Sequence, residues 1–109
     1  MLSESMKEEV VRGLTDIFQK NISMIILYGS EARNEATDES DIDIAIIVKE
    51  KMNDAAKRRL VSWAASMDLR YEKVFSIVDI QEDNMKKWES VLPFYRNVRK
   101  EGIILWKAA

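Results

Sequence analysis

The stretch LYGSEARNEATDESDIDIAIIV, residues 27–48, carries most of the structural and chemical information in this chain. A short apolar run at residues 22–28 ends at Gly29, which predicts a buried strand followed by a turn. Residues 30–40 are polar and lack strong periodicity, which predicts a loop with room for one helical turn. Residues 41–48 alternate and then become continuously apolar, as in a central strand that starts with two exposed aspartates.

Two features of this stretch point to a phosphate and metal site. Asp41 and Asp43 are two residues apart, so on a strand both carboxylates project from one face and can bind one hard cation or bridge two. Gly29 lets the backbone approach a ligand without a Cβ atom in the way, and Ser30 adds a hydroxyl donor. Free N–H groups at the start of a helical turn attract phosphate oxygens.

A third carboxylate, Asp79, lies on a further predicted strand at residues 74–80, where period two places it on an otherwise apolar face. An ionised acid in such a position costs several kcal/mol unless a cation or hydrogen bonds compensate. A metal ion shared with Asp41 and Asp43 would supply that compensation. The alternative is that Asp79 caps a helix that begins near Glu82.

The remaining elements surround these strands. Ser5 and Glu8 have capping-box spacing at the start of a first helix. Asn53 can cap a second helix that ends near Tyr71, and a third follows at residues 82–89. Pro93 suits the first turn of a fourth helix and Gly102 its end, before a tail at residues 103–106 that adds a strand or contacts a partner. The order predicts one α+β domain over residues 1–109, with helices packed on a mixed sheet of three to four strands.

Composition excludes several classes of function. The chain of 109 residues has no histidine and no cysteine, so histidine-based and thiolate catalysis and disulfides are excluded. Its formal net charge of -2 disfavours nonspecific binding to DNA. No apolar run approaches the roughly 20 residues of a membrane span, and we expect a cytoplasmic protein. Any catalyst here depends on carboxylates, backbone dipoles and metal.

The motif resembles a known family. Gly29-Ser30, ten intervening residues and then Asp41-x-Asp43 are similar to the signature of DNA polymerase beta-type nucleotidyltransferases. The short chain and the ending YRNVRKEGIILW, residues 95–106, resemble the minimal nucleotidyltransferases of bacteria and archaea, which are often paired with HEPN-domain proteins in toxin-antitoxin modules. Asn34 departs from the glycine that this family usually has after the arginine.

The resemblance implies a nucleotidyltransferase fold with two sets of site residues. The nucleotide-binding set is Gly29, Ser30, Arg33 and Ser40, and the catalytic, metal-binding set is Asp41, Asp43 and Asp79. The resemblance also implies Mg²⁺ as the cofactor, with two ions expected and Mn²⁺ as a substitute. Two readings from the residues alone stay open, because Arg33 can instead pair with a neighbouring glutamate and Ser40 can cap the turn.

The implied reaction transfers a nucleoside monophosphate, AMP from ATP, to an acceptor hydroxyl on a HEPN toxin, so the chain would act as an antitoxin. Two alternatives remain. The first is a noncatalytic antitoxin that neutralises its partner by binding alone. The second is a small-molecule nucleotidyltransferase that works as a homo-oligomer, since the chain is too short to build an acceptor pocket of its own.

Overall fold

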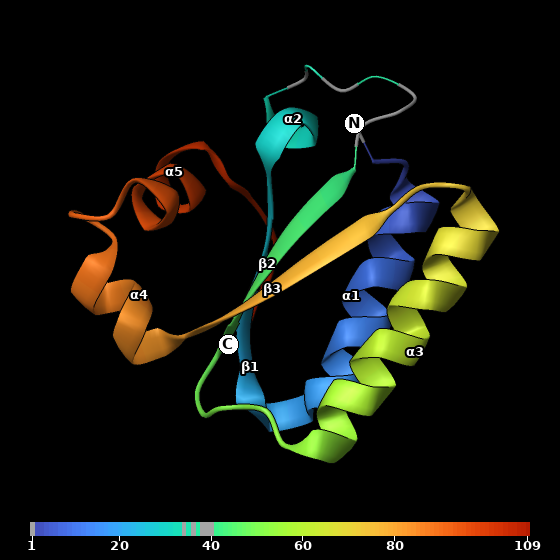
Figure 1. Ribbon diagram of the computed structural model, residues 1–109, viewed down its shortest axis with the longest axis horizontal. Coiled ribbons are helices and arrows are strands. Elements are labelled where there is room, and N and C mark those ends of the chain that lie inside the picture. The colour runs from blue at the N-terminus through green and yellow to red at the C-terminus, as the bar shows by residue number, and fades with distance from the viewer. Residues whose placement is uncertain (1, 34, 36, 38–40) are drawn as a thin grey trace.

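The strands of the chain form one sheet, and the helices form a layer on each side of it (Figure 1). The computed structural model describes residues 2–33, 35, 37 and 41–109. The strands are β1 (Ile22–Tyr28), β2 (Ile42–Val48), β3 (Phe75–Gln81) and β4 (Ile103–Lys107). The helices are α1 (Glu4–Phe18), α2 (Gly29–Ala32), α3 (Asp54–Tyr71), α4 (Glu82–Trp88) and α5 (Pro93–Glu101), with a 3-10 turn η1 (Gln19–Asn21).

The sheet is mixed, and its strand order is β3-β2-β1-β4. β1 pairs antiparallel with both β2 and β4. β2 and β3 are parallel, and α3 provides the crossover between them. The predicted mixed sheet is therefore confirmed, and the C-terminal tail forms its fourth strand.

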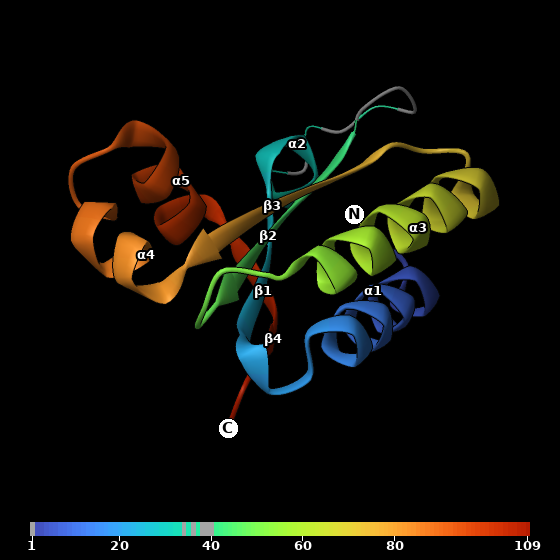
Figure 2. The same ribbon diagram turned by 60° about the horizontal axis from the view of Figure 1, so that its bottom comes forward.

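Strand alternation divides the core into two layers. Ile42, Ile44 and Ile46 of β2 pack with α1 and α3 on one face, whereas Ala45 and Ile47 pack on the other. That second face is covered by α4 and α5, as Figure 2 shows. Each residue of β2 is thus assigned to a face by its position in the alternation.

Helix caps partly follow the sequence prediction. Asn53 caps α3 as predicted, since its side chain accepts a hydrogen bond of 2.8 Å from the backbone N–H of Ala56. The predicted cap at Ser5 is wrong, because α1 begins earlier and Ser3 accepts the hydrogen bond from the N–H of Met6. No helix in the described part of the chain is both long and apolar enough to cross a bilayer.

Candidate active site

Asp43 lies at the centre of the candidate site, near the start of β2. It pairs with Tyr28 on β1 and with Ser76 on β3. Paired residues of neighbouring strands project to the same side of a sheet, so these three side chains share the face that α4 and α5 cover. Asp43 is half-buried there.

Gly29 brings the backbone of the next loop directly against this carboxylate. It directly follows β1 and has a φ of +73°, a left-handed conformation that glycine adopts without strain. A Cβ atom at this position would lie 2.4 Å from Oδ2 of Asp43, closer than any nonbonded contact allows. Gly29 therefore leaves room for the Asp43 carboxylate, and its predicted role in approaching a ligand stays a prediction.

Two carboxylates and one guanidinium set the electrostatics of the site. Burial raises the pKa of Asp43, and the neighbouring charge of Asp41 raises this pKa further, while Arg33 opposes both effects. Asp41 is exposed and immediately precedes β2. Asp41 and Asp43 together form an oxygen donor set for a hard cation, which would offset the effect of the Asp41 charge on Asp43. The residues present therefore fit a divalent metal ion.

The loop residues occupy different positions around this pair. Ser30 is half-buried in α2, and its carbonyl accepts a hydrogen bond of 2.9 Å from the N–H of Glu35. The Arg33 guanidinium lies 3.5 Å from a carboxylate oxygen of Glu35 and 3.6 Å from one of Glu101. The prediction of a glutamate partner for Arg33 is thus confirmed for Glu35. The predicted contributions of Ser40 and Asn34 fall outside the described residues.

Asp79 does not join the other two acids. It pairs with Ile46, which faces α1 and α3, whereas Asp43 faces α4 and α5. It also lies three residues beyond Ser76, which is about 10 Å along the strand. The expected convergence of three carboxylates is therefore wrong, because an odd separation on a strand reverses the side. Among the described residues, no group of three or more acids, histidines or cysteines is arranged to hold a metal ion.

The site includes two residues that the sequence prediction missed, Tyr28 and Ser76. The side chain of Tyr28 makes an edge contact with Phe94 of α5, with ring centroids 5.7 Å apart. Burial and the charge of Asp43 raise the pKa of Tyr28. The sequence could have indicated Tyr28 as a site residue, because it directly precedes Gly29. No such signal exists for Ser76, because only the register of two distant strands places it beside Asp43.

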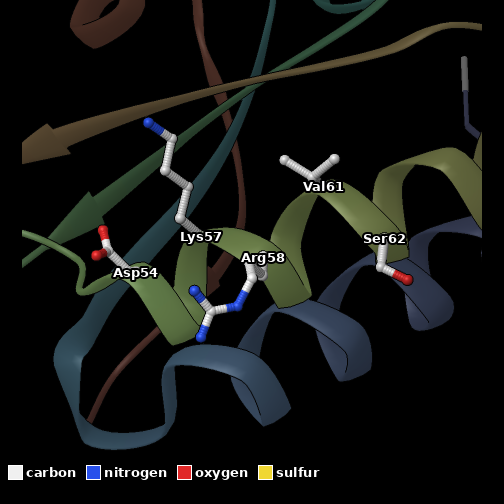
Figure 3. Close-up of a pocket in the computed structure, with 5 residues that line it drawn as sticks. All are labelled: Asp54, Lys57, Arg58, Val61 and Ser62. Atoms are coloured by element: carbon white, nitrogen blue, oxygen red, sulfur yellow. The ribbon is translucent and has the colours of Figure 1, made fainter.

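Two surface hollows lie apart from the carboxylate pair. One, of about 420 Å³, runs along α3, where Figure 3 shows Lys57 and Val61 projecting from the same side of the helix. The other, of about 490 Å³, has Ile47 and Met85 in its lining, toward the opposite end of β2 from Asp43. Neither hollow is lined by a predicted site residue. Within the described chain, the candidate site is therefore defined by its carboxylates rather than by these hollows.

Comparisons with known proteins find relatives that match most of the chain. The family described as "Polymerase beta, Nucleotidyltransferase" matches residues 13–108. The chain is 35% identical to "Putative protein adenylyltransferase MJ0604" of Methanocaldococcus jannaschii, over 97% of this chain and 100% of that protein. It is 30% identical to MJ0141, named in the same way in the same organism, over 63% of this chain and 70% of that one.

Solved structures show the same fold at lower identity. A toxin-antitoxin crystal structure with AMP-PNP matches with a TM-score of 0.68 and 20% identity, over 94% of this chain and 73% of that chain. The tri-AMPylated HEPN toxin of Shewanella oneidensis in complex with its MNT antitoxin gives a TM-score of 0.63 and 19% identity. That match covers 98% of this chain and 74% of the other. The predicted α+β nucleotidyltransferase fold is confirmed by these likenesses.

Proposed function

The chain belongs to the Polymerase beta nucleotidyltransferase family, and we propose that it transfers AMP from ATP to a hydroxyl group of a partner protein. One observation carries the proposal: the Asp43 carboxylate lies against the backbone of Gly29, with Asp41 beside it. This places two metal-binding oxygen donors next to the loop that would hold the triphosphate. The 35% identity to a protein named as an adenylyltransferase supports AMP as the group transferred.

In the proposed reaction, the acceptor hydroxyl oxygen forms a bond to the α-phosphorus of ATP. The bond from that phosphorus to the oxygen bridging to the β-phosphorus breaks, and pyrophosphate leaves with the electron pair. The hydroxyl proton passes to a base or to solvent. No histidine is required for this chemistry, which is consistent with a chain that contains none.

Each side chain has a proposed role. Asp41 and Asp43 would hold Mg²⁺, which when bound neutralises phosphate charge and lowers the pKa of the attacking hydroxyl. The backbone at Gly29 and the hydroxyl of Ser30 would bind phosphate oxygens. Arg33 would turn from its exposed glutamate partners to the triphosphate, since such surface ion pairs contribute at most about 1 kcal/mol. Ser40 stays a proposed member of the nucleotide-binding set.

The proposed acceptor is a HEPN toxin, which makes the chain an antitoxin in the cytoplasm. Two structural neighbours support this proposal, because their descriptions name a toxin-antitoxin pair with a nucleotide analogue and an AMPylated HEPN toxin with its MNT antitoxin. A protein acceptor also suits a site whose outer carboxylate, Asp41, is exposed.

The test is transfer of radiolabel from ATP labelled at the α-phosphate to a purified candidate HEPN partner, with Mg²⁺ present. We expect labelled HEPN with the wild-type chain and a loss of at least a hundredfold with Asp43→Asn, which keeps the shape of the side chain and removes its charge. ATP labelled at the γ-phosphate is the matched control and should transfer no label. Equal labelling by Asp43→Asn and wild type would contradict the proposal.

A noncatalytic antitoxin is the second candidate, and the serine at position 76 beside Asp43 favours it, because the described site then holds only two acids. Toxin neutralisation in cells separates the two candidates. If Asp43→Asn protects cells as well as the wild type does, binding alone is sufficient. If protection is lost while the variant still copurifies with the toxin, transfer is the biological activity.

A further inference from the structure

The register between β2 and β3 determines which side chain of β3 can reach Asp43. Pairing begins at the first residue of β2, where the N–H of Ile42 donates to the carbonyl of Val74 at 2.8 Å. The start of β3 is also tied to α3, because the N–H of Phe75 donates to the Asp68 carboxylate at 2.8 Å. The start of β3 is thus fixed by hydrogen bonds to both β2 and α3, and this places Ser76 directly beside Asp43.

Both distance and side-chain direction favour Ser76 over Asp79 as the residue of β3 that lies beside Asp43. Neighbouring strands lie about 4.8 Å apart, so the hydroxyl of Ser76 and the carboxylate of Asp43 stand side by side on one face. Asp79 would have to cross the sheet and cover about 10 Å along the strand to reach the same point. The sheet itself separates the two faces, and Ile44 and Ile46 are buried on the face that Asp79 shares.

We propose that Ser76, and not Asp79, is the contribution of β3 to the cation site of Asp41 and Asp43. The resulting two-carboxylate site takes up its divalent cation together with the triphosphate rather than before it. A serine hydroxyl supplies a neutral oxygen, and the affinity of oxygen-ligand sites for divalent cations depends on the number of charged ligands. Phosphate oxygens then provide the negative charge that a third acid does not supply among the described residues. This inference rests on the proposed function for the identity of the ligands.

The test measures Mn²⁺ binding to the full chain by electron paramagnetic resonance, with and without the nontransferable analogue α,β-methylene-ATP. For the wild type we expect weak binding of Mn²⁺ alone and binding at least about tenfold tighter with the analogue. Ser76→Asp adds a charged ligand, so it should tighten binding of Mn²⁺ alone by about tenfold or more. Ser76→Asn, which has the same shape without the charge, should bind as the wild type does.

Asp79→Asn is the second arm, and it introduces no new charge near the site. We expect it to bind Mn²⁺ like the wild type in both conditions, whereas Asp43→Asn loses binding. Weakening by Asp79→Asn comparable to that of Asp43→Asn would overturn the inference. So would a Ser76→Asp chain with wild-type circular dichroism and unchanged Mn²⁺ affinity. If Ser76→Asp does not fold, the Asp79→Asn comparison gives the answer by itself.

The result separates this inference from the proposed function. If Mn²⁺ binding follows the expected pattern but no label reaches the partner, the proposed function is wrong and the ligand assignment stands. If the wild type transfers label but folded Asp79→Asn does not, and Asp79→Asn also binds Mn²⁺ more weakly, the ligand assignment is wrong and the proposed function stands.

Discussion

Gly29 satisfies two constraints that no other residue type meets together. Its φ of +73° is strained for residues with a Cβ atom, and its Cα lies against the carboxylate of Asp43. We expect Gly29→Ala to destabilise the chain by about 1–3 kcal/mol and to abolish nucleotide transfer, because Asp43 must move. Urea unfolding and the label-transfer assay measure the two effects.

Gly102→Ala is the matched control for Gly29→Ala. A Cβ there would collide with the Val98 carbonyl oxygen at 2.3 Å, so stability should fall as well, but the position lies at the end of α5. If Gly102→Ala at equal stability also abolishes transfer, the loss in Gly29→Ala reflects general destabilisation rather than the displacement of Asp43.

Asp43 should make folding stability depend on pH. Its pKa is raised by burial and by Asp41, so the ionised form is disfavoured in the folded chain. The folded wild-type chain is therefore destabilised at pH values above the raised pKa. It regains this stability as the pH falls toward the ordinary pKa of an aspartate. In metal-free buffer, we expect Asp43→Asn to melt at a higher temperature than wild type at pH 7, with the difference vanishing at acid pH. A constant difference across the range would contradict this origin.

The pair Asp41 and Asp43 was predictable from local spacing, but the side chain that β3 places beside Asp43 was not. Spacing alone places Asp41 and Asp43 close together, because residues two apart in an extended chain need no information from elsewhere. Assigning Asp79 required the register between strands joined by an 18-residue helix. Composition and periodicity leave that register undetermined. A shift by an odd number of residues moves an acid to the other face of the sheet.

At the scale of elements, the packing of α1 on α3 depends on Gly13. A Cβ atom there would lie 2.1 Å from Nε1 of Trp63, which packs against the core. In a free helix, Gly→Ala stabilises by about 0.5–1 kcal/mol. Overpacking costs about 1–3 kcal/mol, so we expect Gly13→Ala to be net destabilising in urea unfolding.

The double variant Gly13→Ala with Trp63→Leu checks that cause. A smaller side chain at position 63 leaves room for the new methyl group, so Gly13→Ala should destabilise the Trp63→Leu background less than it destabilises the wild type. The same loss in both backgrounds would show that the indole is not what the methyl group meets.

Element positions were largely predictable because each depends on a local signal. The run at residues 22–28 coincides with β1, and β3 is shifted by one residue from its predicted start at position 74. The cap of α1 was misplaced because Ser3 and Ser5 are both capping residues, and the choice depends on where the helix joins the core.

At the scale of the whole molecule, ligand binding should raise thermal stability only when cation and nucleotide are both present. The charge of Asp41 disfavours ionisation of Asp43 in the free chain, and among the described residues no third acid joins the proposed site. A ligand at tenfold excess over its Kd stabilises by about 1.4 kcal/mol, or several degrees in a domain of this size.

The measurement is a melting curve with Mg²⁺ alone, with α,β-methylene-ATP alone and with both together. Asp43→Asn serves as the control and should show no shift in any condition. If Mg²⁺ alone raises the melting temperature as much as Mg²⁺ and the analogue together, the site carries enough negative charge to bind the cation without the nucleotide.

The sheet as a whole could be predicted only as a class. Strand and helix order indicates a mixed sheet under helices, but the order β3-β2-β1-β4 and the division of helices between two faces arise from long-range packing. The tail at residues 103–106 had two readings, and pairing with β1 selects the strand.

The alternation of β3 also affects how relatives of this chain should be compared. Two sequences can carry the same number of aspartates in the same order and still present different ligand sets. The separation between positions 76 and 79 is odd, so shifting an acid between them preserves composition and reverses its side. On the ligand assignment proposed above, sorting relatives by the parity of that offset would separate chains expected to present two charged ligands from chains expected to present three, using the sequences alone.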